Sequence, residues 1–482
     1  MSTKKKFNVP RFNFEGFQKV KPRLWINVGC LFDIPTATFS TGKKGETIYN
    51  GGFGPLMGIS GVANNYKSTI AHYFCLSLID HLEQSGLPGT IMTYDTEEHI
   101  SLQGLNRLTK RFDYISKTPT TDENRAWQVT SKTFEPGNIW MQKVRENLER
   151  KEKDKDYIIE AECFKDPYED KPYSCHLPTV VEIDSFSETE AESSEEKLSG
   201  DLDSKDTNTY AMGQGLFKTK MFSRFPMLSA SSNNYFMCTF HFGEKLDMQM
   251  NPYAPQPLKK LQFLKGNQNI KGAGTKAEFL LSASWLAHGA ELLKNATTKL
   301  AEYPKDANDL GETDLNIVKL QLLRNKNGPS GIIIPVIVSQ SEGVLPTLTE
   351  FHFCKMKDKF GIGGNDRSYF MELYPDCSLS RTTIRTKIDN DPKLRRAINI
   401  TAELLQLKIY HGLNLPNDFL CDAKTLYEDI EKLGYDWNEL LNTRGYWLFD
   451  QYENEIPFLS TMDLLKIRQG TYKPYFIKEK KQ

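Results

Sequence analysis

The first residues that could do chemistry lie where an apolar run meets a helical pattern. The run spans Pro55 to Ile59, and the apolar residues that follow at helical spacing are Ile70, Phe74, Leu78 and Leu82. Between them lies Gly61-Val62-Ala63-Asn64-Asn65-Tyr66-Lys67-Ser68-Thr69. Because the free N–H groups of a helix N-terminus attract anions, this junction could bind a phosphate group.

The stretch fits the phosphate-loop template except at one position. The template has Gly, four residues, Gly, Lys and then Ser or Thr. Gly61, Lys67 and Ser68 fit, whereas Tyr66 replaces the second Gly. Ordinary backbone angles are allowed at a helix start, so we expect Tyr66 to adopt them without strain. On this motif alone, phosphate binding and a simple helix-start lysine are about equally well supported.

Acidic residues and one histidine follow further apolar runs. Residues 90–94 lead into Asp95-Thr96-Glu97-Glu98, residues 179–183 lead into Asp184, and residues 235–240 lead into His241. In a parallel sheet, ligands bind at the carboxyl ends of the strands. A strand that ends in Asp has the form of a Walker B element, whose Asp helps to hold Mg²⁺. The alternatives are a solvated acidic turn and a histidine whose hydrogen bonds are satisfied at a strand end.

Two groups of cations stand apart from the phosphate loop. Residues 242–279 are rich in Lys and Gly and are opposed only by Glu244, Asp247 and Glu278. Such a segment could follow a phosphodiester backbone, or it could be a solvated loop. Arg324 and Lys326 come at alternate positions after an apolar run and so point the same way. They could be solvated strand ends or a clamp on phosphate charge.

The alternation of strand and helix patterns predicts an α/β fold, with a parallel sheet and helices on both faces. We expect a strand at 25–34, a loop at 40–54, irregular structure at 109–136, a helix from 139, an inserted loop or hairpin at 156–178, a loop at 186–209, a helix at 214–231, a hairpin of 315–323 with 331–339, and a helix at 394–407. From about residue 352 the chain reads as a separate region of short helices and loops.

Composition narrows the class of protein. Lys and Arg number 61 against 62 Asp and Glu, so any nucleic-acid site must be a local patch. The eight cysteines form no CxxC pair, which favours reduced thiols over a zinc site or a disulfide frame. No signal peptide is expected, because no apolar stretch follows the basic N-terminus. The longest apolar run, 331–338, is too short to span a membrane, so no membrane partner is expected.

The order of these elements resembles bacterial RecA and, more closely, the phage strand-exchange recombinases of the UvsX kind, over roughly residues 25–410. The loop from Gly61 to Ser68 is similar to the UvsX-type loop, which also has an aromatic residue before the Lys. Tyr94-Asp95-Thr96-Glu97 resembles the family's acidic strand end, and Ile183-Asp184-Ser185 resembles its Walker B element. His241 stands where UvsX-type proteins also carry His.

The resemblance implies a RecA-type P-loop ATPase core over 25–350. It adds an N-terminal arm at 1–24, with a possible role in oligomerisation, and a small mixed C-terminal region at 351–482 of unknown role. It implies that residues 61–69 bind ATP, with Lys67 on the phosphates and Mg²⁺ held by Ser68 and Asp184. Glu97 would orient the attacking water, and His241 would sense the γ-phosphate.

The resemblance also assigns the cations. Arg324 and Lys326 would reach a neighbouring subunit's ATP. The first DNA loop would be 186–213 and the second 242–279. The second loop would contact DNA through Lys245, Lys259, Lys260, Lys265, Lys271, Gly272, Gly274 and Lys276. The first loop is acidic, so we do not expect its glutamates to touch DNA. The family's adenine-stacking position falls near Gly104, which cannot stack.

The function implied is an ATP-dependent recombinase. It would form helical filaments, as a homo-oligomer, on single-stranded DNA and exchange strands with double-stranded DNA in phage recombination, repair and replication. It would act in the cytoplasm of an infected bacterial host, with single-strand binding and loader proteins as further partners. The alternatives are a ring helicase motor with the same core and a non-catalytic DNA-coating protein.

Overall fold

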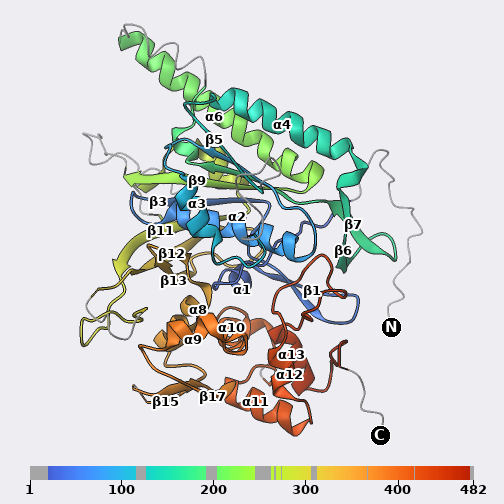
Figure 1. Ribbon diagram of the computed structural model, residues 1–482. Helices are drawn as coiled ribbons and strands as arrows, with labels where there is room; N and C mark the ends of the chain where they lie inside the picture. The colour runs from blue at the N-terminus through green and yellow to red at the C-terminus, as the bar shows by residue number, and fades with distance from the viewer. Residues whose placement is uncertain are drawn as a thin grey trace, which may run out of the picture.

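The computed structural model describes residues 20–115, 126–191, 204–244, 262–264, 268–272, 274–305, 312–365, 367–416 and 418–477 (Figure 1). Most of the N-terminal arm predicted at 1–24 lies outside these residues. Within them, no helix is both long and apolar enough to cross a membrane. All eight cysteines fall in the described ranges and are free thiols.

A ten-stranded sheet forms the centre of the molecule. Across it run, in order, β14 (Gly343–Val344), β13 (Ile333–Ser339), β12 (Leu315–Asn325), β11 (Ala283–Leu292), β3 (Leu56–Gly61), β9 (Asn234–Glu244), β8 (Thr179–Asp184), β4 (Ile91–Asp95) and β5 (Trp127–Ser131), with β10 (Gln268–Ile270) paired to β9. Neighbours from β11 to β5 are parallel, whereas β12, β13 and β14 add antiparallel pairs. The sheet is therefore mostly parallel, as predicted.

Helices cover both faces of this sheet. On one face lies α2 (Lys67–Gln84); on the other lie α4 (Gly137–Lys153) and α6 (Ser204–Ser232), which Figure 1 shows together above the strands. Side chains along β8 alternate between the two faces. Val180 packs with Phe74 and other α2 residues in what we call the α2 core, while Val181 packs with Trp140 and Phe222 in the α4–α6 core. The predicted α/β fold class is confirmed.

Two expectations near the N-terminus were wrong. The strand expected at 25–34 is absent from the described structure, apart from a single bridge between Ile26 and Phe53. Cys30 and Leu31 adopt positive φ, and the Asp33 carboxylate accepts the N–H groups of the turn, so the chain bends into α1 (Asp33–Thr36). The loop expected at 40–54 instead contains a hairpin of β1 (Thr38–Thr41) and β2 (Thr47–Asn50).

The two predicted DNA loops are partly regular structure. Within 186–213, a 3₁₀ turn, η3, spans Phe186–Glu188, and α6 begins at Ser204, ten residues before the predicted helix start at 214. Within 242–279, β9 continues to Glu244, β10 pairs back onto it, and α7 (Gly274–Leu280) follows. Backbone pairing and helix formation therefore replace the expected open loop in the described parts of both segments.

Other elements complete the core. The insertion at 156–178 is a hairpin of β6 (Ile158–Lys165) and β7 (Pro172–His176), preceded by the 3₁₀ turn η2 (Lys155–Tyr157), and the predicted 315–339 hairpin is β12 with β13. The irregular structure expected at 109–136 was wrong for 127–131, which forms β5. The helix α3 (Leu102–Thr109) and strand β11 had not been expected.

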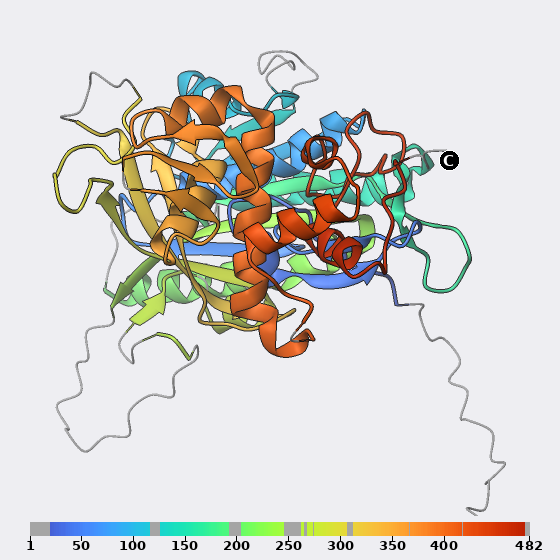
Figure 2. The same cartoon turned by 90° about the horizontal axis from the view of Figure 1, so that it is seen from below.

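The C-terminal region packs beneath the sheet (Figures 1 and 2). It contains α8 (Pro346–Met356), a sheet of β15 (Ile362–Gly364), β16 (Tyr369–Met371) and β17 (Tyr374–Leu379), α9 (Ile384–Asn390), α10 (Pro392–Gln406), η4 (Leu407–His411), η5 (Gly412–Asn414), α11 (Ala423–Lys432), α12 (Trp437–Leu441) and α13 (Thr461–Arg468). The predicted boundary at 350 falls within α8. Much of the region has its own core, but Trp447 packs into the α2 core and donates a 3.2 Å hydrogen bond to the Trp25 carbonyl.

Candidate functional site

A cavity of about 520 Å³ opens at the carboxyl edge of the sheet, between the β3–α2 junction and the segment after β4. It is lined by residues of both segments and by His241 of β9; the lining residues are Ala63, Asn64, Asn65, Tyr66, Lys67, Ser68, Thr69, His72, Glu97, His99, Ile100, Ser101, Gly104, Leu105, Arg107, Leu108 and His241. The sequence-predicted phosphate loop, Glu97 and His241 therefore meet around one space. The three lie together because their parallel strands end at the same edge.

The phosphate loop has the expected strand–loop–helix form. Residues 62–66 connect the end of β3 to Lys67, the first residue of α2, so the free N–H groups of this helix face the loop. Gly61 packs against β11, where an added Cβ would lie 3.2 Å from the Cβ of Ala287. Asn65 is buried and donates a 3.2 Å hydrogen bond to the Ala287 carbonyl. The loop is thus fixed at its base, while Val62, Ala63 and Asn64 are exposed and Ser68 and Thr69 are half-buried.

The expectation of ordinary angles at Tyr66 was wrong. Tyr66 is the N-cap of α2 and has φ 55° and ψ 22°, which is the left-handed conformation. A non-glycine residue there costs roughly 1–2 kcal/mol. The ring packs against the α2 core, and its phenol oxygen accepts a 2.8 Å hydrogen bond from the Asn316 amide on β12. These contacts hold the strained conformation in place.

Glu97 and His241 form a direct pair at the cavity. Nε2 of His241 lies 2.9 Å from Oε1 of Glu97. Partial burial opposes ionisation of Glu97, but the charge of Lys67, together with the contacts to His241, outweighs it and lowers the pKa of this carboxyl. Glu97 is therefore a carboxylate at neutral pH, held beside the loop lysine and able to accept a proton or orient a water molecule.

Asp184 is fully buried at the end of β8, next to Asp95 at the end of β4. Its Oδ1 accepts a hydrogen bond from the Thr239 hydroxyl on β9. Its Oδ2 has no hydrogen-bond partner among the described residues. A buried carboxylate oxygen without a donor is an unfavourable arrangement unless a cation neutralises it. Asp184 and the Ser68 hydroxyl, as oxygen donors, fit the requirements of Mg²⁺.

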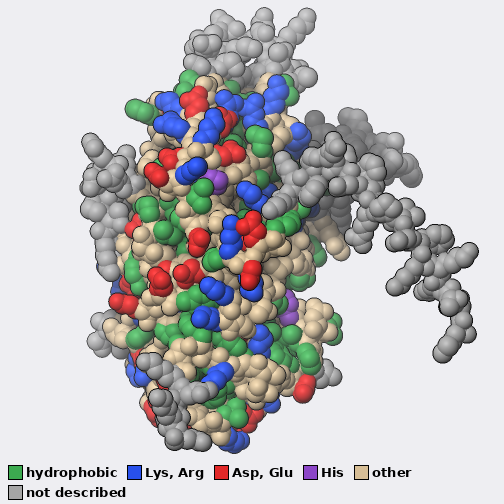
Figure 3. Space-filling model, turned by 90° about the vertical axis from the view of Figure 1, so that its right-hand side faces the viewer, with side chains coloured by type: hydrophobic (Ala, Val, Ile, Leu, Met, Phe, Trp, Pro, Cys, Tyr) green, Lys and Arg blue, Asp and Glu red, His purple; other side chains and the backbone are tan. Residues whose placement is uncertain are grey.

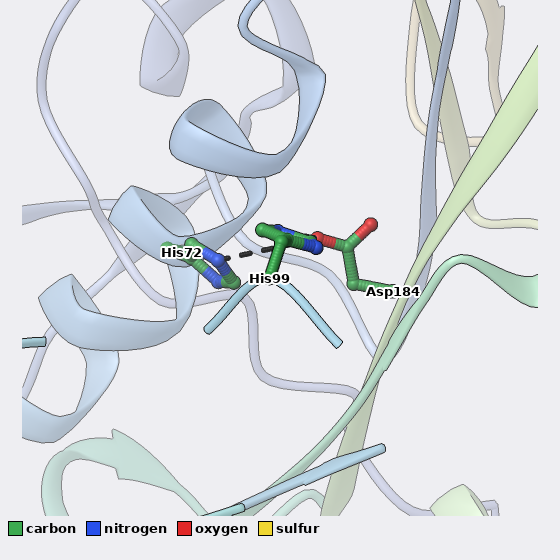
Figure 4. A group of neighbouring side chains, drawn as sticks. All are labelled: His72, His99 and Asp184. Carbon is green, nitrogen blue, oxygen red and sulfur yellow. Dashed lines mark ion pairs between the residues drawn. The ribbon is translucent and has the colours of Figure 1, made fainter. Parts of the chain in front are cut away.

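Two histidines that the sequence analysis missed lie beside Asp184 (Figure 4). His72, on α2, places Nε2 4.0 Å from Asp184 Oδ2, and His99, in the segment after β4, places Nε2 3.5 Å from the same atom. Burial disfavours the His72 imidazolium, but the Glu182 carboxylate outweighs this and raises the pKa of His72. The sequence did offer a signal for each, because His72 comes five residues after Lys67 and His99 comes two residues after Glu97.

The cation pair does not lie at this cavity. Register along the strands places Arg324 and Lys326 beside the starts of β11 and β3, at the opposite end of the sheet from the phosphate loop. The Arg324 guanidinium donates to the carbonyls of Phe279 and Leu281, and Lys326 Nζ donates to the Leu280 carbonyl at 2.8 Å. The two side chains point the same way, as predicted, and hold the last carbonyls of α7.

Only some of the predicted DNA-contacting residues are described. Lys245, Lys259, Lys260 and Lys265 lie outside the described residues. Gly272 has φ 73° and packs so closely that a Cβ would lie 2.6 Å from Ser187 Cα. The Lys276 side chain is exposed and donates to Ser223 Oγ at 2.7 Å, and Gly274 begins α7. Figure 3 shows the side of the molecule that carries β6 and β7, where basic and acidic side chains are interspersed.

The comparisons with known proteins are sparse. No family model matches the chain, and a search of curated proteins finds no match. Among solved structures the chain is similar to one described as the crystal structure of the RadB recombinase, with a TM-score of 0.32 and 11% identity over 61% of this chain and 92% of that one. A likeness of this size is too small to bear on activity.

Proposed function

We propose that the chain is an ATP-dependent DNA recombinase of the RecA kind, which assembles on single-stranded DNA and promotes pairing and strand exchange with duplex DNA. The observation that carries this proposal is the Glu97–His241 pair beside Lys67, at the mouth of a cavity formed by the phosphate loop. This arrangement combines an anion-binding helix start, a lysine and an ionised carboxylate, which suits hydrolysis of a bound nucleoside triphosphate.

In this proposal, Lys67 and the N-terminus of α2 hold the phosphates of ATP. Ser68 and Asp184 would hold Mg²⁺, which neutralises phosphate charge when bound. Glu97 orients the attacking water and accepts its proton, and its lowered pKa keeps it ionised for that task. Phosphoryl transfer is mostly positioning and charge neutralisation, and a cation from the next subunit, Arg324 or Lys326, would complete the site and make assembly a condition for hydrolysis.

A short relay supports coupling between the nucleotide and the second DNA loop. The Ser187 hydroxyl accepts the backbone N–H of His241 at 2.8 Å and donates to the Lys271 carbonyl at 2.8 Å. The backbone N–H of Lys271 donates in turn to the His241 carbonyl. In this proposal, a movement of His241 on binding ATP would reach the Gly-rich end of the 242–279 segment through these contacts. The affinities for ATP and DNA would then be linked reciprocally.

The finer proposal is a phage strand-exchange recombinase of the UvsX kind. Tyr66 before the loop Lys and His241 near the end of β9 support it, since UvsX-type proteins also carry an aromatic residue and a histidine at these positions. It would act with single-strand binding and loader proteins in the cytoplasm of an infected cell.

Strand exchange between circular single-stranded DNA and linear duplex tests the function. Wild type should form joint molecules only with ATP, and Lys67→Ala should form none. Absence of joint molecules at every ratio of protein to DNA would overturn the proposal. Electron microscopy with a non-hydrolysable ATP analogue should show helical filaments; closed rings would instead favour a helicase motor, and DNA coating without any ATPase would favour a passive coating protein.

A further inference from the structure

Two imidazoles and one carboxylate converge behind the phosphate loop (Figure 4). His72 comes from α2, His99 from the segment after β4, and Asp184 from the end of β8. One ligand atom from each lies within 4.8 Å of the others. In a tetrahedral site with metal–ligand bonds of about 2.0–2.1 Å, ligand atoms are roughly 3.3 Å apart. The separations from Asp184 Oδ2 are 3.5 and 4.0 Å, and all three ligand atoms lie within 4.8 Å of one another, so the side chains would move closer together around an ion.

Each histidine is oriented by a second carboxylate behind it. His72 Nδ1 is 2.8 Å from Glu182 Oε1, and His99 Nδ1 is 3.5 Å from Asp95 Oδ1. Glu182 is fully buried and accepts a 2.7 Å hydrogen bond from Thr93. Histidines that bind metals almost always donate the other ring N–H to a carboxylate or carbonyl, which fixes the tautomer. Here both rings direct Nε2 toward the same point.

The carboxylate supplies an independent indication of a cation. Asp184 is fully buried, and its Oδ2, the atom that both Nε2 atoms approach, has no hydrogen-bond partner among the described residues. In the tautomer whose Nδ1 donates to the carboxylate behind it, each ring presents the Nε2 lone pair to Asp184 Oδ2, so three electron-pair donors face one another. A positive ion between them would satisfy all three.

We propose that His72, His99 and Asp184 bind a divalent transition metal ion of the zinc class. Imidazole nitrogen suits such ions, whereas Mg²⁺ selects oxygen ligands and keeps its water shell. His72 and His99 also line the cavity, which leaves a coordination position open to water or a ligand. This site goes beyond the function proposed above.

One consequence does rest on that function. Because Asp184 belongs to both sites, zinc bound here would withdraw it from Mg²⁺ and slow ATP hydrolysis. Zinc binding would therefore lower the rate of Mg²⁺-dependent ATP hydrolysis.

The test is zinc binding by the full-length protein without nucleotide, measured in competition with a chromophoric chelator. Wild type should bind one Zn²⁺ per chain that excess Mg²⁺ does not displace. His99→Ala should weaken this binding at least tenfold, as losses in metal sites commonly do. His99 is 42% exposed, so its removal should leave the thermal unfolding midpoint unchanged. His288→Ala is the matched control, since His288 is an exposed histidine that contacts Gln321 on β12.

Equal zinc affinity in wild type and His99→Ala, or no zinc uptake by wild type, would overturn the site. Lys67→Ala separates the two proposals, because it should abolish ATP binding and leave the zinc titration unchanged. A wild type that binds zinc but not ATP would refute the proposed function alone, and the reverse result would refute the metal site alone.

Discussion

The phenol oxygen of Tyr66 accepts a 2.8 Å hydrogen bond from the Asn316 amide, across 250 residues of sequence. This contact ties the end of the phosphate loop to β12, the strand that carries Arg324 at its far end. It accompanies a left-handed backbone at Tyr66, the conformation for which the template's glycine is suited. The aromatic residue therefore adopts the glycine geometry and adds a tertiary anchor.

Substitutions at Tyr66 should separate the backbone from the ring. In Tyr66→Gly, relief of strain offsets the lost hydrogen bond, so we expect a change in unfolding free energy below about 1 kcal/mol and retained ATP binding. Tyr66→Ala keeps the strain and loses the ring, and we expect destabilisation of about 2 kcal/mol. Denaturant unfolding and nucleotide titration measure both. If Tyr66→Gly folds and binds ATP but does not hydrolyse it, the ring itself takes part in turnover.

Replacing Glu97 by Gln should remove hydrolysis without removing nucleotide. The amide cannot accept a proton, so kcat should fall by about 10²–10⁴-fold while ATP affinity stays within an order of magnitude. Glu98→Gln is the matched control, because Glu98 accepts a hydrogen bond from the backbone of Thr133 instead of His241. Steady-state ATPase with DNA, together with nucleotide titration, distinguishes the two. Equal losses in both variants would argue against the assigned role of Glu97.

The cation pair can be tested by mixing defective subunits. If Arg324 acts on a neighbour's ATP, mixing Arg324→Ala with Lys67→Ala should recover ATPase at interfaces that combine an intact loop with an intact cation. Lys319→Ala, on the same strand but paired with Glu291, should by itself retain ATPase activity. Filament assembly must be checked in parallel, since Arg324 also holds the end of α7. Intact assembly with no recovery contradicts action in trans.

Acid should weaken the joint between β12 and the C-terminal region. Arg385, which is almost fully buried, binds both carboxylate oxygens of Asp314 at 2.8 and 2.9 Å. Partial burial opposes ionisation of Asp314, but the hydrogen bonds from Arg385 and Ser339 lower its pKa to about 2. The unfolded chain binds this proton first, so the stabilisation is complete above about pH 4 and disappears as pH falls toward 2.

Asp314→Asn should therefore lower the free energy of unfolding by about 2 kcal/mol at pH 7, less than the 3–5 kcal/mol lost from a fully buried pair. The difference from wild type should close near pH 2. Denaturant titrations at several pH values measure it, with Asp376→Asn, at an exposed aspartate of β17, as the control. A difference that does not change with pH would assign the effect to packing instead of charge.

The sequence predicted those strands and helices whose residues carry a clear apolar pattern of their own. The run from Thr179 to Asp184 predicted both a buried strand and a carboxylate at its end, because every residue of β8 is buried. Strand β5 was not predicted, because the short stretch that begins with Trp127 shows little alternation of apolar and polar residues. It is held by pairing with β4 and by the hydrogen bond from Trp127 Nε1 to Thr93.

In the candidate site, too, local sequence signals and contacts between distant residues differ in how far they could be predicted. The template glycine was itself a sign that the Tyr66 position needs positive φ, and reading the position as an ordinary helix start missed it. The His72–Glu182 contact joins residues 110 positions apart, so no spacing rule could pair them. Contacts of this kind depend on the register between strands and helices, which one sequence does not reveal.

The phosphate loop and the Arg324–Lys326 pair lie at opposite ends of the sheet, so the two ends of the subunit are chemically different. A contact in which one copy's cations meet another copy's loop uses two different surfaces and so repeats head to tail. The two ends of such a polymer would differ. At one end, the phosphate loop would have no neighbour to supply cations; at the other, Arg324 and Lys326 would have no neighbour's nucleotide to contact. Nucleotide turnover would then differ between the two ends, and growth and shedding of subunits would favour opposite ends.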